Sequence, residues 1–188
     1  MKYLMNVLLA SFALVPLAGV AKAADYAAPA PQETAASGLY FRGDLGGSWL
    51  DWSTATSPWA FTGGAGVGYQ FDPNLRTDLT WTWSGNYTVA PGASLNTDVV
   101  LGNVYFDWKN DSAFTPYVGA GLGYGWQWSD NAALVPNNQG VAVGLAAGVA
   151  YDMTNNLAVD VGYHFHDILS SGTSVPEHQV TAGLRVKF

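Results

Sequence analysis

Along residues 39–188, apolar and polar side chains alternate with a period of two, which is the spacing of a β-strand with two different faces. No segment in this range shows the apolar stripe of an amphipathic helix. Clusters of Gly, Pro, Asn, Asp and Ser interrupt the alternation and divide it into eight runs. We predict strands at 39–49, 59–71, 75–84, 95–108, 115–127, 139–151, 157–167 and 177–188.

The connections between these runs alternate in length. The pattern predicts short turns at 72–74, 109–114 and 154–156, and longer loops at 50–58, 85–94, 128–138 and 168–176. An even number of strands with alternating short and long connections is typical of an up-and-down barrel in an outer membrane. Each run also has about the nine to eleven residues with which a tilted strand crosses a bilayer. Both ends of the barrel would lie on the side of the short turns.

The two faces of the predicted strands differ in character. Apolar and aromatic residues fill one face; in the last strand, Val180, Leu184 and Phe188 share this side. The other face carries glycines and most of the charges. We expect these charges to form one network in the lumen: Arg42, Asp44, Arg76, Asp78, Asp107, Asp160, Arg185 and Lys187. A soluble sandwich with this face inward would bury eight charges, each costly unless it is well paired.

A soluble sandwich with the charged face outward remains an alternative, because a second sheet could cover the apolar face. Two features favour lipid instead. Aromatic residues gather near both ends of the strands, where a membrane has its two interfaces. Closure into a barrel also removes every sheet edge, as hydrocarbon surroundings require. The predicted fold class is therefore all-β, an eight-stranded antiparallel up-and-down transmembrane β-barrel with its apolar face outward.

The start of the chain differs from the rest. Residues 1–23 are predicted to be a signal peptide, since Lys2 precedes a largely apolar stretch and Ala21-Lys22-Ala23 has the form that signal peptidase cuts. Residues 24–37 are rich in Ala and Pro and are predicted to be a flexible leader. The barrel would occupy residues 38–188. The alternative to cleavage and export is a retained N-terminal anchor.

Composition narrows the function. After residue 23 the chain has five basic residues against fourteen acidic ones, so it has no electrostatic reason to bind nucleic acid. It has no cysteine, which excludes disulfides, thiolate catalysis and cysteine-based metal sites. Only 11% of the residues are charged, well below the fraction usual for a soluble surface.

Five segments carry a family resemblance: LYFRGDLGGSW, GNVYFDW, TPYVGAGLGYGW, YDMTNNLAVDVGYHFHDI and HQVTAGLRVKF. In this order the chain resembles the OmpA-like and opacity-type eight-stranded outer-membrane barrels, especially the small surface-antigen barrels of alphaproteobacteria. The resemblance implies a location in the outer membrane of a Gram-negative bacterium. It also implies that Phe188 is part of the signal read by the barrel-assembly machinery.

Two groups of lumen residues invite chemical hypotheses. The eight charges could plug the lumen or line a narrow ion path, and a plug is favoured because side chains about fill an eight-stranded barrel. His164 and His166 both point inward and are candidate ligand-binding residues for haem or a small molecule. They could also ligate a metal, for which Glu177 or His178 would be the third ligand, or act as a base with Ser170 or Ser171 nearby. The simpler interpretation, which we favour, is a hydrogen-bonded histidine pair.

We therefore expect a structural surface protein that contributes to envelope integrity, and no enzyme, metal or cofactor. The runner-up is a narrow channel or a binder of haem or another small ligand, and an enzyme acting on lipid A comes third. Expected partners are outer-membrane lipid, lipopolysaccharide, the assembly machinery and host or environmental surface ligands. We expect a monomer. The loops look short and mildly acidic, with Asp51, Asp98, Asp130, Asp167 and Glu177.

Overall fold

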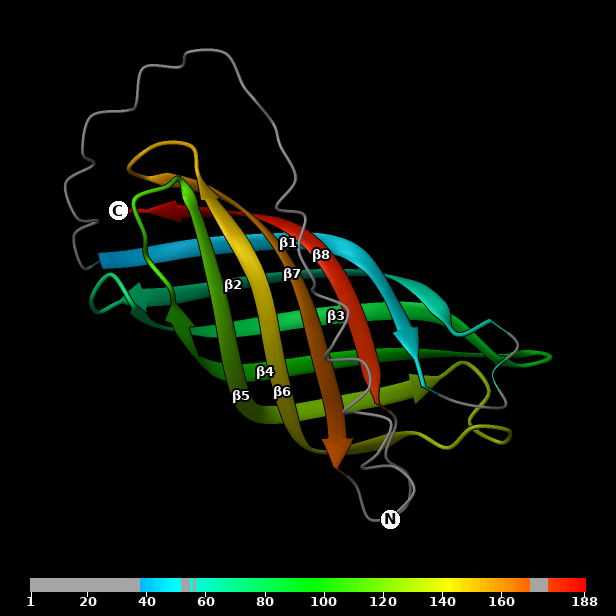
Figure 1. Ribbon diagram of the computed structural model, residues 1–188. Helices are drawn as coiled ribbons and strands as arrows, with labels where there is room; N and C mark the ends of the chain where they lie inside the picture. Colours follow the sequence, from blue (N-terminus) through cyan, green and yellow to red (C-terminus); the bar gives the residue numbers. More distant parts are fainter. Residues whose placement is uncertain (1–37, 52–54, 56, 170–175) are drawn as a thin grey trace, which may run out of the picture. The chain divides into compact units, whose positions relative to one another are not determined.

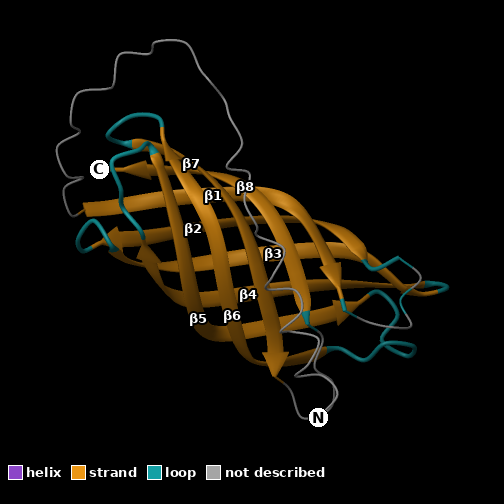
Figure 2. Ribbon diagram, in the orientation of Figure 1, coloured by secondary structure: helices purple, strands orange, loops and turns teal. Residues whose placement is uncertain are grey.

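The computed structural model describes residues 38–51, 55, 57–169 and 176–188, and the regular elements in these ranges are all β-strands (Figure 2). In this part of the chain, no helix has the length and apolar character needed to cross a membrane. The predicted signal peptide at 1–23 and the predicted leader at 24–37 lie outside the described residues.

Eight strands form one closed antiparallel sheet in chain order, with β1 paired to both β2 and β8 (Figure 1). The predicted fold class is confirmed. The strands are β1 (Gly38–Leu50), β2 (Trp59–Gln70), β3 (Leu75–Ala90), β4 (Ala93–Asp107), β5 (Phe114–Ser129), β6 (Asn138–Asp152), β7 (Leu157–Leu169) and β8 (Glu177–Lys187).

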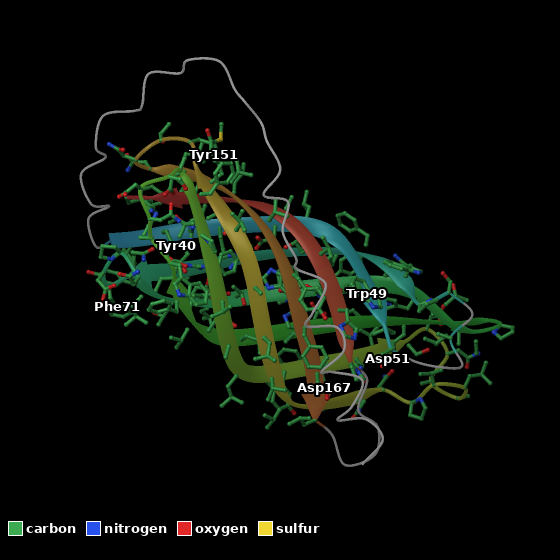
Figure 3. All side chains as sticks on the ribbon, viewed as in Figure 1. Tyr40, Trp49, Asp51, Phe71, Tyr151 and Asp167 are labelled. Carbon is green, nitrogen blue, oxygen red and sulfur yellow. The ribbon has the colours of Figure 1, made fainter. Side chains whose placement is uncertain are left out.

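The barrel has two unlike ends. The turn end carries the short connections 71–74, 108–113 and 153–156, and side chains stabilise them; Asp72, for example, accepts hydrogen bonds from the backbone N–H groups of Asn74 and Leu75. The loop end carries the other four connections. In Figure 3, Tyr40, Phe71 and Tyr151 lie at the turn end, and Trp49, Asp51 and Asp167 lie at the loop end. Both Gly38 and Phe188 are at the turn end, as predicted.

The prediction of a long loop at 85–94 is wrong. β3 and β4 continue through this segment and are joined only by Pro91 and Gly92, whose φ of 79° suits the third position of a Pro-Gly turn. The sheet pairing shifts register between Gly85 and Tyr87, and Asn86 adopts a φ of 70° there. This β-bulge inserts an extra residue and reverses which face each following side chain occupies. The loss of phase explains why the alternation appeared to end at residue 84.

The outer wall is apolar and exposed, and the charged residues lie inside. Leu45 and Leu122 are 62% and 64% exposed, whereas Arg76 is completely buried. A continuous apolar surface of this size is unfavourable in water and requires apolar surroundings. The described residues form a single closed sheet, so none of them builds a second sheet over this face, and the predicted barrel is confirmed over the sandwich.

Candidate functional site: the layered lumen

Seven of the eight predicted charges meet in the turn-end half of the lumen. We call them the charged layer: Arg42, Asp44, Arg76, Asp78, Asp107, Asp160 and Arg185. Arg76 is its most deeply buried member, and its Nε lies 3.0 and 3.1 Å from the two carboxylate oxygens of Asp107. Its guanidinium carbon also lies 3.8 Å from the centre of the Tyr105 ring, a favourable cation–π contact.

Arg42 joins two carboxylates, Asp44 on its own strand and Asp78 on β3, two strands away. Its Nη2 lies 2.8 Å from Asp44 Oδ1, and its Nη1 donates to Asp78 Oδ2 at 3.3 Å. Asp78 also accepts hydrogen bonds from Asn103 at 2.8 Å and from the Tyr40 hydroxyl at 3.1 Å. Arg42 and Asp78 are therefore buried with partners and Asp44 is partly buried with one, which removes most of the cost of desolvation.

A second part of the charged layer lies against β7 and β8. The Tyr117 hydroxyl donates to Asp160 Oδ1 at 2.5 Å, and Arg185 Nη2 lies 3.9 Å from Asp160 Oδ2. The Arg185 guanidinium carbon lies 5.7 Å from the centre of the Tyr40 ring. Arg185 and Asp160 come from adjacent strands, so this ion pair follows the wall and does not cross the lumen.

Lys187 is the exception among the predicted charges. It is half-buried at the edge of the lumen, and within the described ranges no carboxylate lies within ion-pair distance of it. Lys187 occupies the last residue of β8, where the lumen opens at the turn end, so its membership of the lumen network stays a prediction. The lysine that is paired at this end is Lys109, whose Nζ lies 2.6 Å from Asp152.

Glycines make room for the large side chains of the charged layer. A Cβ atom at Gly68 would overlap the ring of Tyr40, and one at Gly119 would overlap the ring of Tyr105. Glycine at these two positions therefore lets an aromatic ring approach the backbone of the neighbouring strand closely.

The middle of the lumen is tightly filled, by polar side chains and by a small apolar cluster of Val99, Leu101, Ala142 and Ile168. His164 and His166 both point into it, with ring centres 6.3 Å apart, and His166 is 6% exposed. They border a void of about 20 Å³, about the size of one water molecule. Pockets that hold cofactors or drug-sized molecules have volumes of roughly 300–1,000 Å³. The described lumen therefore offers no space for haem.

Glu177 was expected on a loop, but it is buried in this middle layer. It accepts hydrogen bonds from Ser48 at 2.9 Å, Thr97 at 2.7 Å and Gln179 at 2.6 Å. The phase of β8 contains the signal for this placement, since Glu177 shares the inward parity of Gln179 and Arg185. Three hydrogen-bond donors replace the water that the carboxylate loses on burial.

His178 points the opposite way, onto the outer wall. Its Nδ1 lies 2.6 Å from the Tyr163 hydroxyl, and its ring stacks on Trp49 with centres 5.2 Å apart. It therefore cannot complete a site with His164 and His166. Among the residues that the structure describes, no three His, Cys, Asp or Glu side chains are grouped so as to hold a metal ion. Ser170 and Ser171, the predicted partners for a catalytic base, lie outside those residues.

An apolar cluster lies at the loop end of the barrel. We call it the apolar cap, and its members are Leu50, Tyr87, Val89, Ala93, Leu95 and Val135. Leu95 is 1% exposed and Tyr87 is completely buried. The bulge at Asn86 turns Tyr87 and Val89 inward, and the 130–137 connection folds back so that Val135 joins them. The Tyr87 hydroxyl is hydrogen-bonded to Ser48, which links the cap to the middle layer.

Phe188 lies outside the barrel wall at the turn end. Its backbone N–H donates to the carbonyl of Leu39 at 3.0 Å, and its ring meets Phe41 edge-on with centres 5.5 Å apart. The side chain is nevertheless 73% exposed. Its packing in the folded barrel is therefore slight, and its ring is accessible.

Comparison with known proteins gives results that agree with the barrel fold. Residues 10–188 match the family model described as "Outer membrane protein beta-barrel domain". An uncharacterized protein of Haemophilus influenzae is 30% identical over 168 residues, covering 79% of this chain and 88% of its own length. An uncharacterized protein of Brucella suis biovar 1 is 28% identical over 199 residues, covering 73% of this chain and 70% of its own length.

Among solved structures, Neisserial surface protein A (NspA) is similar to this chain. The match covers 81% of this chain and 99% of that one, with 26% sequence identity and a TM-score of 0.70. The barrel described above and the family match therefore agree.

Proposed function

Because this chain belongs to the outer membrane β-barrel domain family, we propose that it is a structural surface protein that contributes to envelope integrity through a plugged barrel. The chain is located in the outer membrane of a Gram-negative bacterium. The exposed apolar wall suits contact with membrane lipid and lipopolysaccharide. We further propose that the barrel is monomeric, with the turn end toward the periplasm and the loop end outside the cell.

The observation that carries the proposal is the filled lumen. A charged layer occupies the turn-end half, a hydrogen-bonded layer occupies the middle, and the apolar cap closes the loop end. The two seals differ in chemistry, so water and ions meet both a field of fixed, paired charges and a dry apolar barrier. A barrel built in this way separates two compartments and stabilises the membrane around it, but it passes no solute.

The same observation weighs against the channel and the haem binder. The lumen void beside His164 and His166 has about 20 Å³, and the apolar cap separates it from the loop end. A catalytic role for these histidines is disfavoured for the same reason, because no substrate reaches them. We therefore propose that the protein is not an enzyme. Its expression should leave the mass of the host's lipid A unchanged in mass spectrometry, and a new lipid A species would overturn this part of the proposal.

Deletion of the chromosomal copy in the source bacterium tests the structural role. The deletion strain should become more sensitive to detergents and bile salts, and the wild-type chain should restore resistance. A variant carrying His164→Ala and His166→Ala should restore it equally well, because no ligand is involved. Heat-dependent migration on gels verifies that the variant is folded. Unchanged sensitivity of the deletion strain would contradict the structural role, and failure of the folded histidine variant would favour a ligand-binding role.

Phe188 supports a separate proposal about assembly. Its ring is 73% exposed, so we propose that it is read by the barrel-assembly machinery. Phe188→Ala should lower the amount of folded barrel in the outer membrane severalfold but leave refolding into detergent unchanged. Phe114→Ala is the matched control, since Phe114 is also an exposed aromatic at the turn end. Equal losses for both variants, or a refolding defect for Phe188→Ala, would overturn this proposal.

A further inference from the structure

The outer wall carries one large hollow at its loop end. It has a volume of about 1120 Å³ and lies over the middle of β3, the first half of β4, the end of β5 and the start of β6. We call it the tryptophan groove and define it by Trp81, Asp98, Val100, Trp126, Trp128 and Gln139. The hollow is open on one side and its volume is that of a binding cleft, whereas the lumen void beside His164 and His166 is about the size of one water molecule.

Three indole rings form the walls of the groove. Trp81, Trp126 and Trp128 are 51%, 39% and 38% exposed, so much of each ring is free for contact. Interfacial tryptophans are ordinary in membrane barrels and would not by themselves indicate a ligand. What sets this group apart is that its three rings border a single hollow together with polar side chains.

The second observation is a carboxylate on the outward face. Asp98 shares that face of β4 with Val100, Val104 and Phe106, and is cross-strand neighbour to Trp83 and Trp126. The Trp81 indole N–H donates to its Oδ1 at 2.7 Å. This bond fixes the carboxylate in the groove and leaves lone pairs for other donors. An ionisable group on the outer wall of a barrel is unfavourable near the bilayer centre and tolerated at the interface.

The chemistry of these side chains fits a sugar ring. A pyranose presents C–H groups on its faces, which pack on an aromatic surface, and hydroxyl groups around its edge. Carboxylate and amide groups such as those of Asp98 and Gln139 accept from and donate to hydroxyls. Flat aromatic walls with a few fixed polar groups are also the usual composition of a small-molecule site.

Charge decides which kind of sugar is suitable. The basic residues after residue 23 lie elsewhere, with Arg42, Arg76 and Arg185 in the lumen and Lys109 and Lys187 at the turn end. Near the groove, Asp130 accepts hydrogen bonds from the hydroxyl and the backbone N–H of Ser94, and these bonds hold its pKa below its ordinary value. The loop end is therefore negative, which disfavours sulfated, phosphorylated or carboxylated ligands.

We propose that the tryptophan groove binds a neutral saccharide presented from outside the cell. Indole rings stack on the sugar faces, and Asp98 and Gln139 hydrogen-bond to the hydroxyls. This inference rests on the proposed exposure of the loop end and names the ligand class that the surface would take. It does not depend on whether the lumen is plugged.

Saturation-transfer NMR on the protein refolded in detergent micelles tests the proposal. The probes are neutral tetrasaccharides of glucose, galactose, mannose and N-acetylglucosamine, with a sulfated oligosaccharide as comparison. We expect transfer to the ring protons of at least one neutral probe and none to the sulfated one. Trp128→Ala should weaken that binding at least tenfold. Asp98→Asn should weaken it severalfold and reduce the discrimination against the sulfated probe.

The matched control is Trp59→Ala, which removes another exposed loop-end tryptophan, 62% exposed, from β2 and should leave binding unchanged. Transfer to none of the neutral probes, equal weakening by Trp59→Ala, or transfer to the sulfated probe alone would overturn the proposal. If binding occurs only when the sugar is carried on a glycolipid in vesicles, the ligand is a membrane glycolipid, and the proposal that the saccharide comes from outside the cell is wrong. Surface labelling of loop-end residues on intact cells tests exposure separately, so failure of the groove and failure of the proposed orientation remain distinguishable.

Discussion

The two halves of the lumen are enclosed by the same sheet but are filled by opposite chemistry. In the turn-end half, Arg76 and Asp107 are buried as a hydrogen-bonded ion pair. In the loop-end half, Leu95 and Val89 are equally buried in an apolar cluster. The difference teaches that a barrel with an apolar outer wall does not require a polar interior throughout. A single bulge at Asn86 changes the phase of β3 and sends apolar side chains inward.

The two fillings should respond differently to truncation, and the largest effect is expected in the charged layer. Arg76→Ala leaves Asp107 buried without its cation and should destabilise the barrel by about 3–5 kcal/mol in urea unfolding of the refolded protein. The double variant Arg76→Met with Asp107→Leu removes both charges and should lose much less stability. If the double variant is as unstable as the single one, unpaired charge is not the cause.

Truncation in the apolar cap should be costly for another reason. Leu95→Ala opens a cavity that its neighbours cannot fill, and we expect a loss of roughly 3 kcal/mol in the same unfolding assay. Leu122→Ala on the outer wall is the matched control, because lipid or detergent fills the space and only the transfer contribution is lost. A control that lost as much stability as Leu95→Ala would mean that the cap is loosely packed.

The bulge that turns Tyr87 and Val89 inward can be tested directly. Asn86 has a φ of 70°, a conformation that costs most L-residues about 1–2 kcal/mol. Asn86→Gly should therefore retain full stability, whereas Asn86→Val should lose about that amount in urea unfolding. Equal stability of the two variants would indicate that the backbone at this position relaxes to an ordinary strand.

The smallest effect is expected at Lys187, which shares the charged face but has no ion pair in the described part of the barrel. Lys187→Ala should change stability by less than about 0.5 kcal/mol, with little dependence on salt. Arg185→Ala, two residues away and buried beside Asp160, should cost several times more. Similar losses for the two would show that position on the face, and not pairing, determines the contribution.

Much of this architecture follows from the sequence because its causes are local. Period-two alternation predicts all eight strands, and the phase of β1 and β3 places Arg42 and Arg76 inside. The apolar cap is not predicted, because one extra residue at the bulge reverses the faces of Tyr87 and Val89 and makes the alternation appear to stop. Glu177 and His178 follow the phase of β8, but their proximity to a loop concealed it.

The tryptophan groove illustrates what one-dimensional pattern cannot show. Trp81, Asp98 and Trp126 lie on three different strands, and only the barrel's register brings them side by side. Periodicity predicts that the two tryptophans face outward, but the hydrogen bond from Trp81 to Asp98 depends on cross-strand geometry. A site whose residues come from several strands can therefore be recognised only from the structure.

The central claim is that two unlike seals close the lumen, and planar-bilayer conductance of the refolded protein tests it most directly. One variant opens the cap (Tyr87→Ala with Leu95→Ala), a second opens the charged layer (Arg76→Ala with Asp107→Ala), and a third combines them. Leu122→Ala serves as control, and heat-dependent migration verifies folding. We predict no steady channels for the wild type or for either single-seal variant, and channels for the combined variant. Steady channels in the wild type would contradict the account.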